Sequence, residues 1–409
     1  MRNRTKKVVV IGAGIAGLSA AHYLRKHGID VFVLEREKFV GGVMRTTLKE
    51  ERYIIELGPN TFQAGSEPIV RLTNELSIAP LIVGSDALSR YRYVWSGGKM
   101  RRVPTSMPSS FTSNLASLAG KIKLFSKLLA QKQPSENEAL ENYILPKIVV
   151  VESEFGKVFD KHGLLSFRWG MGTITARLEE ELRSRVQVGT EATSIERRKD
   201  GGLKIYIENH VVPVEADAII IATPSFFAAR LLTNLAPQIS ESLASIPYSP
   251  IAVVHTSFGE KDVHKKLDGF GVLVSRHEGI RMIGSIWSSA IFPVRCPKGE
   301  ILLTNFIGGP TDPLILELPD NEIIDEVLAG LNKVMGIYAK PRFVYLKRWL
   351  QAIPQNIMGH ESKLEQIGLG LAKLPGVFIT GSYFSGASVS DTIAHARSEV
   401  DRVVAHLKN

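Results

Sequence analysis

Val8-Val9-Val10-Ile11-Gly12-Ala13-Gly14-Ile15-Ala16-Gly17-Leu18 stands near the start of the chain and decides its fold. A β-branched apolar run enters a Gly-x-Gly-x-x-Gly turn and continues in a helical pattern, an arrangement that binds dinucleotides. Gly12 allows a tight turn, Gly14 lets a pyrophosphate approach the backbone, and Gly17 lets the helix pack closely on the strand. The helix N-terminus then faces the phosphates.

The next apolar run, Asp30 to Leu34, predicts a second strand of the same sheet. It ends at Glu35, about where an acidic residue would bind the ribose hydroxyls. The stretch therefore predicts these nucleotide-binding residues: Gly12, Ala13, Gly14, Ala16, Gly17, Glu35 and Arg36.

Two further motifs narrow the choice of cofactor. Paired glycines at Gly41-Gly42 permit close backbone approach, and Arg45 places a cation beside a phosphate. The turn Gly58-Pro59-Asn60 follows Glu56. A nicotinamide dehydrogenase does not need this second element, whereas an enzyme that holds a long, extended FAD does. The motifs together favour FAD.

Composition bounds the protein class. The chain has 409 residues, of which 44% are hydrophobic and 22% charged, so we expect two or three globular domains. Its single cysteine, Cys296, excludes an internal disulfide and a multi-cysteine metal site. No apolar run is long enough to span a bilayer, and the glycines near the start fit a nucleotide turn better than a signal peptide. We expect a cytoplasmic protein.

The net charge of +9 is concentrated in one block. No acidic residue occurs from Ala87 to Ser135, while that block carries nine lysines and arginines. We predict no nucleic-acid partner, because no recognised nucleic-acid module accompanies the block. Phe111 to Ala130 has apolar residues at helical spacing with lysines between them. It fits a basic helix on an anionic membrane surface and a solvated helix with a core face equally well.

The remaining chain predicts a second domain inserted into the first. We expect strands at Val186–Ile195 and Leu203–Val214, and a doubly buried strand at Asp217–Pro224. Short strands from Pro250 to Ile307, a helix over Asp320–Val334 and a strand near Arg342–Lys347 then form a mixed sheet.

The C-terminal segment repeats the logic of the opening motif. A buried strand, a glycine-rich loop and a helix follow Gly376, so the chain returns to the nucleotide domain. We expect the helix over Thr392–Leu407, with Asp391 as its cap and its N-terminus aimed at the flavin.

These motifs resemble those of the protoporphyrinogen oxidases, within the flavin amine oxidase superfamily. The segment Gly381 to Ile393 matches as well, and the more specific matches are Gly269-Phe270-Gly271-Val272-Leu273-Val274 and, within Ala352 to Gln355, Ile353-Pro354-Gln355. The resemblance implies an α/β fold (α+β overall): a Rossmann-like FAD domain of the two-dinucleotide-binding type, an inserted mixed-sheet substrate domain and a small helical basic segment. The expected domains are 1–88, 167–235 and 355–409 for FAD, 89–104 and 236–354 for substrate, and 105–166 for the helical, candidate membrane-contact segment.

The resemblance also implies a reaction. The flavin would take six electrons from protoporphyrinogen IX in three cycles, each a hydride transfer to N5, with dioxygen as the acceptor. Coproporphyrinogen III is the alternative substrate, and a flavin-binding protein without this activity is the alternative of another class. Relatives carry several dozen more residues around 140–166, so substrate turnover and membrane contact are the properties that this shortening affects. The oligomeric state stays open.

The site residues follow from the same resemblance. Arg92 is expected to meet a propionate, Leu273 and Ile286 to sandwich a pyrrole ring, and Phe306 to stack on its other side. Without the resemblance, these apolar residues are simply residues of core strands, and Arg92 is one more member of a basic patch. No catalytic side chain and no metal ligand is assigned. The expected cofactor-binding set is Gly12, Ala13, Gly14, Ala16, Gly17, Glu35, Arg36, Gly41, Gly42, Arg45, Gly58, Pro59, Asn60, Ala192, Gly381, Ser388 and Val389.

Overall fold

The computed structural model describes residues 6–87, 89, 91–103, 163–386 and 388–408. The basic helix expected over Phe111–Ala130, and most of the segment 105–166, lie outside the described residues. No helix in these described ranges combines the length and the apolar character that crossing a bilayer requires.

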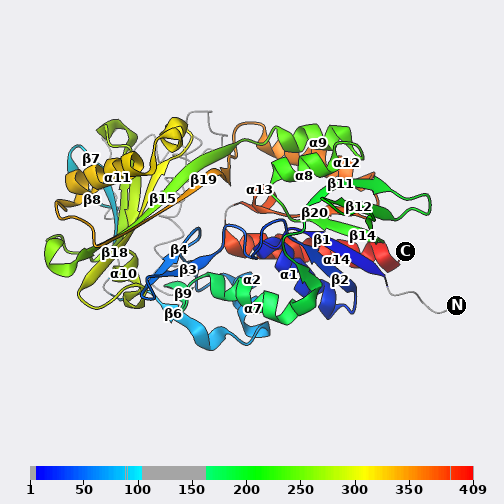
Figure 1. Ribbon diagram of the computed structural model, residues 1–409, viewed down its shortest axis with the longest axis horizontal. Helices are drawn as coiled ribbons and strands as arrows, with labels where there is room; N and C mark the ends of the chain where they lie inside the picture. The colour runs from blue at the N-terminus through cyan, green and yellow to red at the C-terminus, as the bar shows by residue number, and fades with distance from the viewer. Residues whose placement is uncertain (1–5, 88, 90, 104–162, 387, 409) are drawn as a thin grey trace, which may run out of the picture.

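A five-stranded parallel sheet forms the nucleotide half of the molecule, at the right in Figure 1. Its strands in spatial order are β10 (Val186–Gln187), β2 (Asp30–Leu34), β1 (Lys7–Ile11), β14 (Ala218–Ile221) and β20 (Val377–Ile379). The C-terminal strand β20 thus lies two strands from the N-terminal strand β1. Strand β20, near the C-terminus, is thus the edge strand of this sheet. The second strand, loop and helix pattern, after Gly376, predicts this return to the nucleotide domain.

Alternate residues of β1 enter two different cores. Val8 and Val10 pack in one core with residues of the helical layer, while Val9 and Ile11 pack in a second core on the opposite face. This sheet is therefore buried on both faces, as its continuous apolar strands require. The helical layer comprises α1 (Ile15–Lys26), α2 (Glu67–Glu75), α7 (Gly172–Leu182) and α14 (Val389–Lys408). The opposite layer comprises β11 (Ala192–Arg197), β12 (Leu203–Ile207), β13 (Val214–Ala216), α8 (Ser225–Leu232), α9 (Pro237–Ala244) and α12 (His360–Ala372).

A seven-stranded mixed sheet forms the second half, at the left in Figure 1. Its order is β19 (Phe343–Pro354), β15 (Tyr248–Gly259), β18 (Glu300–Gly308), β17 (Met282–Ile286), β16 (Gly269–Val274), β7 (Tyr91–Ser96) and β8 (Lys99–Arg102). The pair β7 and β16 is parallel and the other pairs are antiparallel. Helix α11 (Asp320–Met335) covers one face, where Leu331 packs with Val254 and Leu303.

The other described strands and helices are short. They are β3 (Thr46–Lys49), β4 (Tyr53–Glu56), β5 (Phe62–Gln63), β6 (Ile82–Gly84), β9 (Leu164–Phe167), α10 (Ser288–Ile291) and α13 (Ser382–Ser385). Tyr53 on β4 stacks on Phe343 of the seven-stranded sheet, with ring centroids 4.3 Å apart. Strand β4 therefore packs on the sheet face opposite α11.

Two expected strands prove to be four. The segment expected as one strand over Val186–Ile195 contributes β10 to the parallel sheet and β11 to the antiparallel layer, because the chain turns at Gly189, where φ is +65°. The segment Leu203–Val214 likewise separates into β12 and the start of β13. Strand β19 is longer than the strand expected near Arg342–Lys347. The helix expected over Asp320–Val334 is confirmed as α11.

Candidate functional site

The three glycines of the opening turn have different surroundings. At Gly12, where φ is +105°, a Cβ would lie 2.9 Å from the carbonyl oxygen of Ala222. At Gly17 a Cβ would lie 1.9 Å from the carbonyl oxygen of Gly12. A Cβ at Gly14 would meet no atom of the described chain within 4 Å. Packing therefore requires Gly12 and Gly17, whereas Gly14 exposes bare backbone at the N-terminus of α1, where an anionic phosphate fits.

The second glycine element lies directly on this turn. The Gly41 amide donates to the Ala13 carbonyl over 2.8 Å, and Gly14 and Gly41 form a parallel bridge. A Cβ on Gly42 would lie 3.4 Å from the Cα of Gly14. The structure thus brings both glycine motifs to one surface.

Glu35 is fixed at the end of β2 beside the same turn. Its Oε2 accepts the Ala13 amide over 2.7 Å, and its Oε1 accepts the Glu37 amide over 2.8 Å. Its backbone carbonyl accepts the amide of Thr190, two residues before Ala192 begins β11. The carboxylate that we predict to bind ribose is therefore held in place by backbone donors.

Three further predicted nucleotide residues have defined surroundings. The Arg36 guanidinium lies 4.3 Å from the centre of the Phe227 ring and pairs with Glu37. Ala16 is buried on α1. The Arg45 guanidinium lies 3.7 Å from the centre of the Phe39 ring, and burial lowers its pKa.

The segment Gly58-Pro59-Asn60 packs against the second glycine element. A Cβ on Gly58 would lie 2.1 Å from the Val43 carbonyl oxygen, and the Leu57 amide donates to the Arg45 carbonyl over 2.8 Å. The Asn60 side-chain amide donates to the Gly58 carbonyl over 3.0 Å. The predicted cofactor residues of this segment are thus joined to those of the Gly41 to Arg45 segment.

The C-terminal loop reaches the same edge of the parallel sheet. The Thr380 amide donates to the Ile221 carbonyl, so Gly381 follows β20 beside the end of β14. Helix α14 begins at Val389, and Ser388 Oγ accepts the Asp391 amide over 3.3 Å. The expectation that Asp391 caps this helix is wrong. The helix starts three residues earlier than its apolar pattern indicated, and Ser388 supplies the capping oxygen.

Because β1, β2, β14 and β20 are parallel neighbours, their carboxyl ends meet at one edge, which is where such sheets bind nucleotides. This edge offers open backbone at Gly14, an anchored carboxylate at Glu35 and a helix N-terminus at Val389. The residues present fit FAD.

The four predicted substrate residues share one face of the seven-stranded sheet. Leu273 pairs with Gly284, and Gly284 pairs with Phe306. Ile286 lies two residues after Gly284 and therefore on the same face. Arg92 lies two residues before Val94, which pairs with Leu273. This face is opposite α11 and is the face that β4 contacts.

Arg92 is the cation at one end of this row. Its guanidinium lies 4.8 Å from the centre of the Phe270 ring. Burial lowers its pKa to about 10, so it stays charged at neutral pH in a poorly hydrated position. A guanidinium in such a position is suited to pair with a carboxylate.

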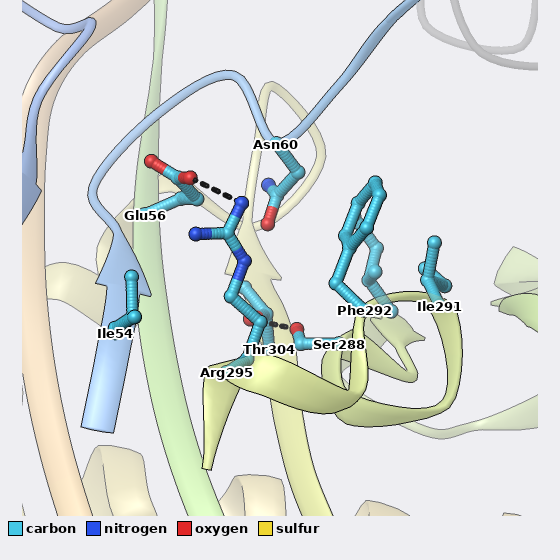
Figure 2. Close-up of a pocket in the computed structure, with 9 residues that line it drawn as sticks. Ile54, Glu56, Asn60, Ser288, Ile291, Phe292, Arg295 and Thr304 are labelled. Carbon is cyan, nitrogen blue, oxygen red and sulfur yellow. Dashed lines mark hydrogen bonds and ion pairs between the residues drawn. The ribbon is translucent and has the colours of Figure 1, made fainter. Parts of the chain in front are cut away.

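A small cavity joins the two halves of the site (Figure 2). Asn60, from the predicted cofactor set, and Ile286, from the predicted substrate set, both line it. Its other lining residues are Ile54, Glu56, Ser288, Ile291, Phe292, Arg295 and Thr304. The cavity is therefore where the nucleotide half meets the apolar sheet face.

The sequence reading missed a buried ion pair in this cavity. Arg295 Nη2 lies 3.1 Å from Glu56 Oε1, and the two residues are 2% and 4% exposed. Burial raises the pKa of the Glu56 carboxyl to about 7, against the opposing effects of Arg295, the Thr46 hydroxyl and the Met171 amide. Nothing in the sequence around Arg295 marks it, whereas Glu56 stands in a motif that was noted.

A second buried polar group adjoins the cavity. His255 Nδ1 lies 3.1 Å from Thr304 Oγ1, which lies 2.7 Å from Ser288 Oγ. Burial lowers the pKa of His255 to about 3, so its imidazole is neutral at physiological pH. In the ranges that the structure describes, no group of three or more histidine, cysteine or acidic side chains could hold a metal ion.

Comparison with known proteins then identifies the family. The model of the "Flavin containing amine oxidoreductase" family matches residues 15–148 and 147–404. The chain belongs to this family. It is an FAD-dependent oxidoreductase, and its cofactor is FAD.

Individual members of the family show how far the similarity extends. The chloroplastic protoporphyrinogen oxidase of Oryza sativa is 27% identical, with 98% of this chain and 88% of the relative covered. The coproporphyrinogen III oxidase of Bacillus subtilis is 26% identical, with both chains covered completely. Among solved structures, a protein of Exiguobacterium sp. 255-15, provisionally described as a protoporphyrinogen oxidase, superposes with a TM-score of 0.80 at 21% identity. That structure covers 99% of this chain and shares its fold.

Proposed function

We propose that this flavin-containing amine oxidoreductase oxidises protoporphyrinogen IX to protoporphyrin IX, with dioxygen as the electron acceptor. The observation that carries the proposal is the common sheet face of Arg92, Leu273, Ile286 and Phe306, which adjoins Asn60 across the cavity. The name of the Oryza sativa relative supports this substrate, and the name of the Bacillus subtilis relative supports coproporphyrinogen III.

The chemistry of this face matches a tetrapyrrole. Leu273, Ile286 and Phe306 offer a broad apolar surface for a pyrrole ring, and Arg92 offers a cation for a propionate at its margin. Apolar lining with a few placed polar groups is typical of small-molecule sites. Bound FAD supplies the two-electron acceptor for a hydride from the substrate.

In this proposal, the side chains of the cavity bind and orient the substrate and do not remove a proton from it. Glu56 is the one carboxylate among the described residues that line the cavity. Arg295 forms an ion pair with it, and the Thr46 hydroxyl and the Met171 amide donate to it. We therefore assign the departing pyrrole N–H proton to solvent or to the substrate itself.

Coproporphyrinogen III is the second candidate substrate, and one further cation favours it. Lys347 pairs with Val253, which pairs with Phe306, so Lys347 lies on the substrate face on the opposite side of the apolar row from Arg92. Arg92 and Lys347 stand on strands five positions apart, about 24 Å across the sheet. Coproporphyrinogen carries a carboxylate on every ring, so it could meet both cations.

Anaerobic mixing of the FAD-loaded enzyme with each porphyrinogen tests the function. We expect protoporphyrinogen IX to bleach the flavin absorbance and porphyrin fluorescence to appear. If coproporphyrinogen III alone bleaches the flavin, and Lys347→Gln abolishes this preference over protoporphyrinogen IX, coproporphyrinogen III is the substrate. If neither substrate reduces the flavin, the chain is a flavin-binding protein without this activity.

The cellular location is a further proposal. We infer a cytoplasmic enzyme whose basic segment contacts an anionic membrane surface. Sedimentation of the enzyme with vesicles of anionic lipid, but not with vesicles of neutral lipid, is the expected result. Equal sedimentation with both would contradict an electrostatic contact.

A further inference from the structure

The segment Gly58-Pro59-Asn60 belongs to the nucleotide half, yet the sheet half holds the residues that precede it. Arg295 follows α10 of the sheet half, and its Nη2 pairs with the Glu56 carboxylate. Trp349 lies on β19, and its indole N–H donates to the Leu57 carbonyl over 2.8 Å. An ion pair and a hydrogen bond from the sheet half therefore hold the consecutive residues Glu56 and Leu57.

The Glu56 carboxylate contacts residues from three parts of the molecule. Thr46 Oγ1 donates to Oε2 over 2.6 Å, and the Met171 amide donates to Oε1 over 2.9 Å. Thr46 follows Arg45 on β3, and Met171 precedes α7. Together with the ion pair to Arg295, these bonds make one buried carboxylate join the second glycine element, the helical layer and the sheet half.

Arg295 has two further contacts besides Glu56. Its Nη2 also donates to Ser166 Oγ over 2.6 Å, and its guanidinium lies 5.3 Å from the centre of the Phe292 ring. Its Nη1 is buried and has no hydrogen-bond partner among the described residues. Figure 2 shows the guanidinium between Glu56 and Asn60. A buried cation with an unsatisfied N–H group destabilises the fold. Apolar side chains could join the two halves without this cost if the contact served the fold alone.

We propose that Glu56, Arg295 and Trp349 are positioning residues for the bound flavin. They set the Gly58 to Asn60 segment at a fixed place relative to the substrate face, so the flavin and the tetrapyrrole meet in one geometry. The proposal rests on FAD binding and not on the identity of the substrate. It assigns a role to three residues that lie outside the predicted site.

The decisive measurement is the visible circular dichroism of the bound flavin, which reports the surroundings of its ring. Glu56→Gln keeps the shape of the side chain and removes its charge, and Arg295→Met removes the cation. We expect each variant to retain FAD, to change the flavin circular dichroism and to lower kcat about tenfold or more, with KM changed less than about threefold. The double variant should lose little more than either single variant, because the pair acts as a unit.

Two further variants separate positioning from simple destabilisation. Trp349→Phe removes one N–H from the Leu57 carbonyl, and we expect a smaller change in the same two readouts. Arg281→Met breaks the half-buried ion pair with Asp312 in the same sheet half, remote from the segment. It should lower the melting temperature and leave the flavin spectrum unchanged.

The result that overturns the proposal is equally plain. If Glu56→Gln and Arg295→Met behave like Arg281→Met, with a lower melting temperature and an unchanged flavin spectrum, the ion pair serves the fold alone. If Arg295→Met does not fold, the spectrum of Trp349→Phe decides. Failure of porphyrinogens to reduce the wild-type flavin would remove the proposed substrate and the kinetic readouts, and leave the circular-dichroism test intact.

Discussion

The two halves of this molecule build their predicted binding surfaces in opposite ways. In the nucleotide half, Gly12, Gly14 and Gly17 fall within one turn, and local backbone geometry creates the surface. In the sheet half, Arg92 and Phe306 are more than two hundred residues apart in sequence and share a face through strand register. Motifs therefore find the first surface, whereas the second depends on which strands pair.

Substitutions in the opening turn test the nucleotide half and have the largest expected effect. Gly14→Val should fold and lose FAD, with binding weaker by about a hundredfold or more, because its side chain occupies the open space where a phosphate approaches. Gly17→Val should lose folding itself, because its Cβ collides with the Gly12 carbonyl. Flavin absorbance after purification and thermal melting of each variant measure both effects. A yellow, fully loaded Gly14→Val protein would contradict the placement of the pyrophosphate.

A pH titration tests the buried polar groups of the sheet half. The pKa of His255 falls from 6.5 to about 3 on folding, so the unfolded chain takes up a proton that the folded chain refuses. Stability should therefore fall as the pH drops from about 6.5 towards 3, by roughly 4 kcal/mol from this group.

Urea unfolding at a series of pH values provides the measurement. His255→Gln should flatten this part of the profile, and His210→Gln, at an exposed position, is the matched control. An unchanged profile for His255→Gln would show that the loss of stability in acid arises elsewhere.

A substitution of Arg92 tests the predicted substrate face. Arg92→Ala should raise the KM for the porphyrinogen about tenfold and change kcat little, because a propionate contact binds substrate and transition state alike. The FAD content should stay unchanged, since Arg92 belongs to the other half. Arg102→Ala removes an exposed cation of the adjacent strand and should leave KM as it is. Equal KM values for the wild type and Arg92→Ala would take Arg92 out of the site.

The smallest expected effect concerns the stacking residue. Phe306→Leu keeps an apolar side chain of similar reach and loses the aromatic face, which contributes about 1 kcal/mol to ring stacking. We expect a rise in KM of about fivefold, measured with the porphyrinogen that reduces the flavin. A larger loss of FAD than of substrate affinity would place Phe306 beside the cofactor instead.

Much of the nucleotide half is readable from the sequence because each signal there is local. The run Val8 to Ile11, the glycines of the turn and Glu35 specify a strand, a bend and a carboxylate within one short stretch. The exceptions are also local. At Gly189 a turn separates two strands that the apolar pattern joins, and Ser388 caps α14 where a carboxylate was expected.

The sequence by itself determined the family and the cofactor, since these depend on short motifs. Only the tertiary structure decided that Arg295 and Trp349 hold the segment before Gly58, and that Lys347 shares a face with Arg92. No local pattern encodes these relations. They arise from strand order and from the packing of one half on the other, which join residues far apart in the chain.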